Sequence, residues 1–303
     1  MTIRPHPGLA TVVAATACSL ALLWILGPAG PQEGPARYIV QARELSGAAA
    51  AVRTVGGTVT HELGIIHAVG ASLTSEEVRR LGEACGDCRL HEDRPARLMG
   101  KPGVVIPDSD FPTLIGADEL HEDEILGTGV TIAIVDSGFW PVNPLTKAPG
   151  DSMRLLAQYD AFTDTHNTKK WVDDDDYGHG THIAAMAAAS STSSTGRFHG
   201  VAPGVNLVSV KAFDEIGGST YATVIQAMDW VVQNKDTYGI RILNASFGAP
   251  VASFYWEDPI NQAVMAAWQA GIVVVASAGN TGPDPMTIQV PANVPYVISV
   301  GAM

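Results

Sequence analysis

The chain has 303 residues, of which 46% are hydrophobic and 16% charged, so it can bury a sizeable core and is not expected to be disordered. Its 31 acidic residues outnumber the 18 basic ones and give a formal net charge of -13. An acidic surface repels phosphate backbones, which argues against nucleic acid as a partner.

The first 35 residues are predicted to be a secretory signal peptide and a short linker. A weakly basic start precedes an uncharged apolar run at residues 8–27, and small residues suited to cleavage follow it. The run is almost long enough to span a bilayer, so an uncleaved anchor is one alternative, and lipid attachment at Cys18 is another. We expect a secreted protein that meets a membrane only through this segment.

Residues 36–98 show the order strand, helix, strand, strand, helix, strand, which predicts a small ferredoxin-like α+β domain. Its last strand is expected within residues 88–98. The second helix, over residues 74–84, begins with a capping Thr or Ser and carries glutamates in its first turn. Cys85 and Cys88 have C-x-x-C spacing, and a local disulfide is the expected state in an exported chain, since no redox setting or further zinc ligands accompany them.

Residues 99–114 contain three prolines and are predicted to be a linker, and from residue 115 to residue 303 strands and helices alternate. Apolar strands are predicted at 129–136, 204–213, 240–246, 272–279 and 297–303. Helices are predicted at 182–190, 259–271 and 219–237, the last with Ser219 as its cap. This α/β pattern predicts a doubly wound parallel sheet, in which functional residues lie just beyond the carboxyl ends of the strands.

Four chemically useful features stand at such positions. Asp136 ends the first strand of this region, His179 precedes a helix, Ser246 ends another strand, and Asn280 follows a further one. A carboxylate, an imidazole, an exposed backbone segment and an amide together suit acyl transfer. A serine hydroxyl needs an adjacent base near neutral pH, and a buried carboxylate fixes the tautomer of that base.

The motifs VTIAIVDSG, GHGTHIAAMAA, ILNASFG and VVVASAGN, in this order, resemble those of the subtilisin-like serine proteases, the subtilases. The resemblance implies that Asp136 is the orienting acid, His179 the general base and Asn280 the oxyanion donor. In the family the first histidine of the segment is the base, so His182 is not expected to act in catalysis. Substrate contacts implied by the resemblance fall on Ser246, Phe247, Gly248, Asp175, Ala278 and Gly279.

The same resemblance makes calcium possible as a structural ion, but no ligand is assigned. The acidic run at residues 173–176 is predicted to be a solvated loop. A calcium site needs six to eight oxygen ligands from several segments, which this run alone does not show. The calcium-binding aspartate that usually follows the orienting acid is not evident after Asp136.

The GTS segment that carries the nucleophile in subtilases is not found in the sequence. We therefore expect the serine to lie beyond Met303, with no peptidase activity in the 303 residues alone and activity in a complete gene product. Residues 36–98 then resemble an inhibitor-type propeptide, which would occupy the active-site groove until a cut between about Leu98 and Pro112 releases it. Polypeptides are the expected substrates.

Two other interpretations stay open at this point. The chain could be a non-catalytic binding protein, either a pseudoprotease or a propeptide-type inhibitor. It could also be a metallohydrolase that uses His179 and His182, although H-G-T-H lacks the glutamate and the spacing of H-E-x-x-H.

Overall fold

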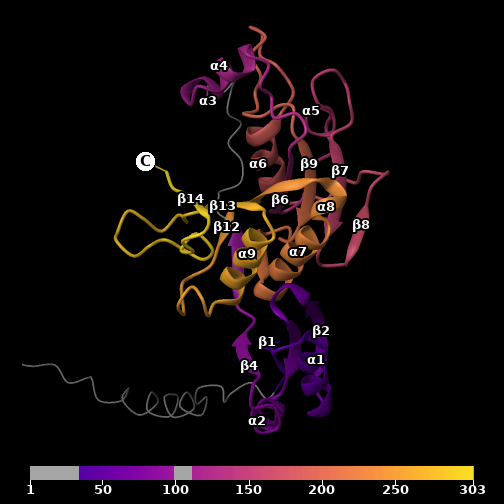
Figure 1. The fold of residues 1–303 in the computed structure, drawn as a ribbon, viewed down its shortest axis with the longest axis vertical. Coiled ribbons are helices and arrows are strands. Elements are labelled where there is room, and N and C mark those ends of the chain that lie inside the picture. The colour runs from indigo at the N-terminus through magenta and orange to yellow at the C-terminus, as the bar shows by residue number, and fades with distance from the viewer. Residues whose placement is uncertain (1–33, 99–110, 303) are drawn as a thin grey trace, which may run out of the picture. The chain divides into compact units, whose positions relative to one another are not determined.

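The computed structural model describes residues 34–98 and 111–302 (Figure 1). The predicted signal segment, including Cys18, and residues 99–110 of the predicted linker lie outside this range. The end of that linker, Phe111–Leu114, is helix α3, so it is not entirely irregular. Residues Ala36–Met303 form one compact unit. Among the helices that the structure describes, none is both long and apolar enough to cross a membrane.

Residues 36–98, here called the N-terminal module, contain an antiparallel sheet of order β2-β3-β1-β4. Helices α1 and α2 pack against this sheet around a small apolar core. The order of elements is the ferredoxin-like one that the sequence predicts. The bounds are β1 Ala36–Gln41, α1 Leu45–Thr54, β2 Thr58–Leu63, the 3₁₀ turn η1 Gly64–Ile66, β3 Ala68–Leu73, α2 Ser75–Ala84 and β4 Arg89–Glu92.

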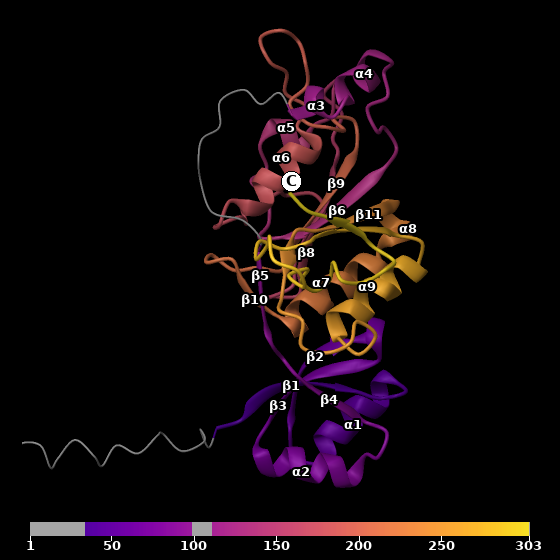
Figure 2. The same cartoon turned by 90° about the vertical axis from the view of Figure 1, so that its left-hand side faces the viewer.

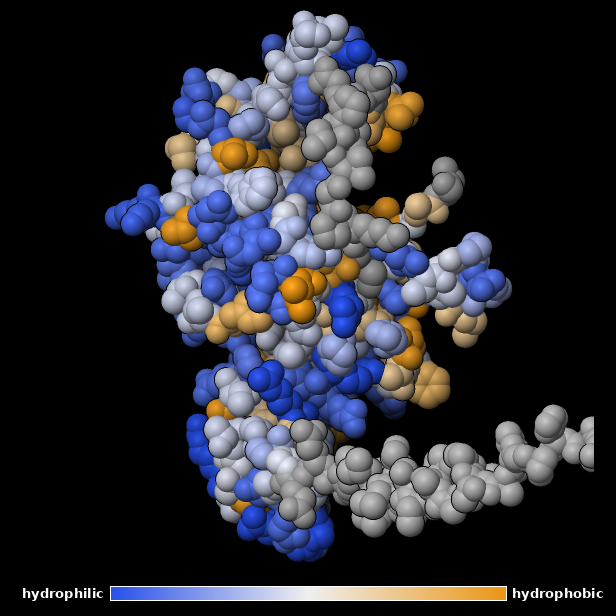
Figure 3. All heavy atoms as spheres, turned by 180° about the vertical axis from the view of Figure 1, so that it is seen from behind, coloured by the Kyte–Doolittle hydropathy of each residue, from blue (hydrophilic) through white to orange (hydrophobic). Residues whose placement is uncertain are grey.

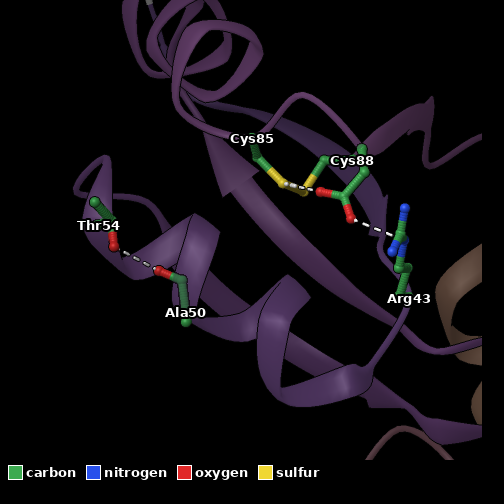
Figure 4. The surroundings of a disulfide bond; sticks show 6 residues. Arg43, Ala50, Thr54, Cys85 and Cys88 are labelled. Atoms are coloured by element: carbon green, nitrogen blue, oxygen red, sulfur yellow. Dashed lines mark hydrogen bonds and ion pairs between the residues drawn. A yellow bond between two sulfur atoms is a disulfide. The ribbon is translucent and has the colours of Figure 1, made fainter.

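Two local predictions in the module are confirmed. The Thr74 hydroxyl accepts a hydrogen bond from the Glu77 N–H, and the Glu77 carboxylate accepts one from the Thr74 N–H, so a capping box starts α2. Cys85 and Cys88 form a disulfide just after α2 (Figure 4). Since both thiols are consumed in this bond, they are unavailable as ligands for a zinc ion.

The predicted last strand of the module is interrupted. Residues Arg89–Glu92 form β4, but Pro95–Leu98 form a separate strand, β5, which belongs to another sheet. Proline has no N–H to donate, so the ladder of β1 cannot continue through Pro95. The chain instead leaves the module's sheet at Asp93 and enters the rest of the protein.

The large sheet has seven strands in the order β14-β13-β11-β6-β9-β7-β8. All neighbouring pairs are parallel except β7 and β8, which are antiparallel at one edge. The sequence predicts five of these strands and misses β7 and β8. The bounds are β6 Thr131–Asp136, β7 Leu155–Asp160, β8 Thr165–Asn167, β9 Asn206–Lys211, β11 Ile240–Ala245, β13 Val273–Ser277 and β14 Ile298–Val300.

Helices cover both faces of the large sheet, as expected for a doubly wound fold (Figures 1 and 2). Along β6, Ile132 and Ile134 pack in a cluster with helix α6, whereas Ala133 and Val135 pack in a second cluster with helices α7 and α9. Successive side chains of a strand point to opposite faces, so β6 is buried on both sides. The helices are α6 His179–Ala188, α7 Tyr221–Gln233 and α9 Pro259–Gln269, with the short α4 Ala117–Glu122, α5 Asn143–Thr146 and α8 Lys235–Tyr238.

A third, small sheet joins the module to the rest of the chain. Strand β5 lies between β10 (Gly218–Thr220) and β12 (Phe247–Gly248) and is antiparallel to both. The cap of α7 is Thr220, whose hydroxyl accepts from the Thr223 N–H, and not Ser219 as the sequence predicts. Ser219 is one residue too early because it is part of β10, where its hydroxyl donates to the Ala212 carbonyl.

Candidate active site

An aspartate and a histidine from two different elements meet at the carboxyl edge of the large sheet. Asp136 is the last residue of β6 and is fully buried, and His179 is the first residue of α6. The Nδ1 atom of His179 lies 2.8 Å from Oδ1 and 2.9 Å from Oδ2 of Asp136. The carboxylate therefore accepts from Nδ1–H, which fixes both the tautomer and the orientation of the ring.

The pair can form because α6 begins very close to the end of β6. A Cβ atom on Gly180 would lie 2.2 Å from the carbonyl oxygen of Gly138, and 3.2 Å from the Cβ of Asp136. Gly138 itself has a φ of 107°, which side chains disfavour. The absence of a side chain at Gly180, directly after His179, therefore lets α6 begin this close to the end of β6.

Two kinds of interaction shift the pKa of the Asp136 carboxyl in opposite directions. Burial raises the pKa of this carboxyl, because the ionised form loses its hydration. The hydrogen bond from His179 and the N–H of Ser137, 2.8 Å from Oδ1, lower the pKa and favour the carboxylate. An ionised Asp136 is thus supported by donors on two sides.

Asp175 differs from the sequence expectation of a substrate contact. It is 1% exposed, and its Oδ1 accepts from the Ser137 hydroxyl at 2.6 Å and from the Gly178 N–H at 2.8 Å. Its Oδ2 accepts from the N–H and the hydroxyl of Thr181. Both oxygens are occupied, so Asp175 fixes the start of α6 and the position of Ser137. The supporting roles of Ser137 and Thr181 were missed, although both stand inside the matched motifs.

The rest of the acidic run is also only partly solvated. Asp174 accepts from the Phe139 N–H at 2.9 Å, and burial raises its pKa to about 6. Asp176 pairs with Lys211 at 3.2 Å, while Asp173 is exposed. The prediction of a solvated loop therefore holds for Asp173 and Asp176 but is wrong for Asp174 and Asp175, because main-chain and hydroxyl donors converge on those two.

Asn280 lies on the same edge as the acid and the imidazole. Strands β6, β11 and β13 are neighbours and parallel, so their carboxyl ends lie side by side. Asn280 is exposed and follows the end of β13 by three residues. Just before it, Gly279 has a φ of 104°, and a Cβ there would lie 2.8 Å from Oε1 of Gln289. The Ala278 carbonyl accepts from the Gln289 N–H at 3.0 Å, so residues 278–279 pack against the Gln289 segment.

The segment predicted to bind a substrate backbone is occupied by the chain's own β5. Phe247 is paired with Leu98, and Gly248 with Arg97. Ser246 directly precedes them, and its hydroxyl donates to Oδ1 of Asn244 at 2.8 Å.

The other side of β5 pairs with β10, a strand that the sequence does not predict. We call the space between β10 and β12, which β5 occupies, the groove. Gly218 pairs with Arg97, and the Leu98 N–H donates to the Gly217 carbonyl at 3.1 Å. Ala96 and Leu98 are 1% and 7% exposed, so their side chains fill the groove. An extended peptide held by backbone pairing on both sides is the arrangement expected of a bound substrate strand.

Among the described residues, no group of three or more His, Cys, Asp or Glu side chains that could share an ion includes Asp136 or His179. Within residues 34–98 and 111–302, one group of at least three His, Cys, Asp or Glu side chains is close enough to share an ion: Cys85, Asp87 and Cys88. Its two sulfurs form the disulfide.

Comparison with known proteins gives concordant matches. The sequence model of the subtilase family matches residues 127–303. The serine protease AprX of Bacillus subtilis is 40% identical over 59% of this chain, and a thermostable alkaline protease of Halalkalibacterium halodurans is 29% identical over 94% of it. The chain spans 39% of the former and 71% of the latter. Crystalline fervidolysin of Fervidobacterium pennivorans, a keratinolytic enzyme related to subtilisin, has a TM-score of 0.65 at 23% identity, covering 89% of this chain and 43% of its own.

Proposed function

Because the chain belongs to the subtilase family, we propose that it is the precursor of a secreted serine endopeptidase that cleaves polypeptides. The observation that carries the proposal is the Asp136–His179 pair at the carboxyl edge of the sheet. Beside it, an extended segment of the chain lies between β10 and β12. An oriented base next to a peptide-binding groove is what peptide hydrolysis requires.

The chemistry assigned to these residues is acyl transfer. A serine hydroxyl attacks the carbonyl carbon of the scissile bond, and its proton passes to Nε2 of His179. Asp136, hydrogen-bonded to Nδ1–H, stabilises the imidazolium that forms. The side-chain amide of Asn280 donates to the oxyanion. His179 then returns the proton to the leaving amine, and water repeats the cycle on the acyl-enzyme.

We assign the nucleophile to a serine outside these 303 residues. The chain spans well under two thirds of the AprX sequence, and the GTS segment is not among its residues. The edge strand β14 supports this assignment, because Ile298 and Val300 are 54% and 52% exposed there, next to Val273 at 46%. Further chain packed along this edge would cover these apolar side chains. Elsewhere, on the face drawn in Figure 3, hydrophobic residues form only separate patches on a mostly hydrophilic surface.

The N-terminal module is assigned the role of an intramolecular inhibitor. Strand β5 fills the groove, and Ile39, Leu63 and Ile66 share a buried cluster with residues of α7 and α9. A substrate could pair with β10 and β12 only after this strand leaves. We place the maturation cut after Leu98, within the linker at 99–114, and the signal peptide within residues 1–35.

The experiment compares histidine variants of the complete gene product on casein. His179→Ala should abolish turnover, whereas His182→Ala should retain most of it, because His182 is exposed on α6. A serine-directed reagent should inhibit the wild-type protein, and a chelator should not inhibit it directly. Robust cleavage by the 303 residues alone, or equal activity of the two variants, would contradict the proposal. N-terminal sequencing of the mature form would test the cut, which a start inside β6 would refute.

A further inference from the structure

An arginine of the N-terminal module fills a buried acidic seat at one end of the groove. The Nη2 atom of Arg94, the residue just before β5, lies 2.7 Å from Oδ2 of Asp258. Its Cζ atom lies 4.7 Å from the centre of the Tyr221 ring. The side chains of Arg94 and Asp258 are 24% and 1% exposed, so water screens the pair only weakly. We call Asp258 and Tyr221 the guanidinium seat.

The seat is held in place by residues outside the module. Oδ1 of Asp258 caps helix α9 by accepting from the N–H groups of Ile260 and Asn261 at 3.0 and 3.2 Å. Oδ2 accepts from the Tyr221 hydroxyl at 3.2 Å. Burial and the nearby Asp258 charge raise the pKa of Tyr221, so the hydroxyl stays a donor. The carboxylate is therefore fixed before any arginine arrives.

The seat also lies in register with the groove. The Tyr221 N–H donates to the carbonyl of Arg94 at 3.0 Å, and the pairing continues with Pro95 opposite Thr220. The pairing ends where the Leu98 N–H donates to the carbonyl of Gly217, the residue just before β10. A substrate peptide could pair with β10 and β12 in the same register as β5. The residue four positions before the one that takes the place of Leu98 would then lie at the guanidinium seat.

Removal of the module leaves the seat with an unneutralised charge. The Asp258 carboxylate then lacks the cation that pairs with it here, so the seat favours a ligand that supplies one. A planar guanidinium can pair with the carboxylate and stack on the ring at once, which an ammonium does less well.

We propose that the guanidinium seat is a substrate subsite that selects arginine four residues before the position that Leu98 occupies in β5. The inference rests on the proposed function, because it requires that substrates replace β5 in the groove. It adds a specificity-determining contact distant from the acid–base pair.

The test uses quenched fluorogenic peptides that reproduce residues 92–106, with the complete, matured gene product as enzyme. One peptide has the natural sequence, one carries Arg94→Gln and one carries Arg97→Gln. Arg97 is the matched control: it is exposed, and no acidic group among the described residues lies within ion-pair distance of it. Both kcat/KM and the inhibition constant of each peptide against casein cleavage are measured, and mass spectrometry locates the cut.

Arg94→Gln should lower kcat/KM by about tenfold or more, as expected for a shielded charged hydrogen bond, and Arg97→Gln should change it by less than about twofold. Equal losses for the two peptides, or no loss, would overturn the subsite while leaving the peptidase proposal intact. If no peptide and no casein is cut, the peptidase proposal fails. In that case direct binding of the labelled peptides to the same protein tests the subsite. The natural peptide should then bind at least about tenfold more tightly than the Arg94→Gln peptide.

The enzyme variant Asp258→Asn completes the test. Asparagine can keep the cap of α9 through its side-chain oxygen, but it removes the charge of the seat. The ratio of kcat/KM between the natural and the Arg94→Gln peptides should then fall towards one. A ratio that persists in this variant would show that the preference arises elsewhere and would refute the assignment.

Discussion

Asp174→Asn should stabilise the protein in a pH-dependent way. Burial raises the pKa of Asp174 from 3.8 to about 6, so keeping it ionised in the folded state costs free energy. Each pKa unit corresponds to about 1.36 kcal/mol, which makes the full penalty about 2–3 kcal/mol. Asparagine has no charge to desolvate, and its oxygen can still accept from the Phe139 N–H, now 2.9 Å from Oδ1.

The sign follows from proton binding. Between pH 3.8 and about 6 the folded state holds a proton on Asp174 that the unfolded state has released, so wild-type stability falls as the pH rises. Above pH 6 both states are ionised and the whole penalty is present. The advantage of the variant should therefore be small near pH 4, grow by about 1 kcal/mol between pH 5 and pH 8, and then level off.

Urea unfolding of the wild-type chain and two variants at pH 5, 6, 7 and 8 would measure this advantage. Asp173→Asn is the matched control, because Asp173 is the exposed neighbour in the same acidic run. It should change stability little and with no trend over this range. If Asp174→Asn shows no advantage at pH 8, or an advantage that shrinks as the pH rises, the desolvation argument is refuted.

Two further predictions concern residues held in crowded surroundings. Arg154 is fully buried and donates to the carbonyls of residues 144, 145 and 203, so Arg154→Met should cost about 2–4 kcal/mol in urea unfolding by leaving those acceptors unpaired. Arg241→Met, at an exposed position, should cost little; equal losses would contradict the argument. Gly180→Ala should lower the melting temperature and the catalytic activity of the complete enzyme, because the new methyl group meets the Gly138 carbonyl. Gly82→Ala, where a Cβ has open space within α2, should be neutral or stabilising, and tolerance of alanine at position 180 would count against the close approach.

The central architecture could be predicted because its signals are local. The continuous apolar run that forms β6 indicates a strand buried on both faces, and all six of its residues are buried. A polar residue at the end of such a strand in a parallel sheet indicates the functional edge, so the sequence alone predicts that Asp136 lies there. The order of the strands and helices then predicts that His179 lies at the same edge of the sheet as Asp136.

The failures come from contacts between segments far apart in the sequence. Four consecutive aspartates resemble a solvated loop, and nothing local shows that the Ser137 hydroxyl, 38 residues away, reaches Asp175. The same holds for Arg94 and Asp258, which are separated by 164 residues. Each of these side chains is unremarkable in its own segment, and the pairing appears only when the chain is folded.

The N-termini of helices α6, α7 and α9 share one feature: at each, a carboxylate accepts from main-chain N–H groups. The first turns of helices have unpaired N–H groups and favour a carboxylate. Asp175 serves α6 and Asp258 serves α9 from within the large-sheet part, but the carboxylate that accepts from Ala222 N–H in the first turn of α7 is Asp93 of the module, at 2.9 Å. Departure of the module therefore leaves α7 without this carboxylate and Asp258 without its cation. A peptide with an acidic residue followed by arginine restores both, so an aspartate just before the arginine should strengthen the preference of the guanidinium seat.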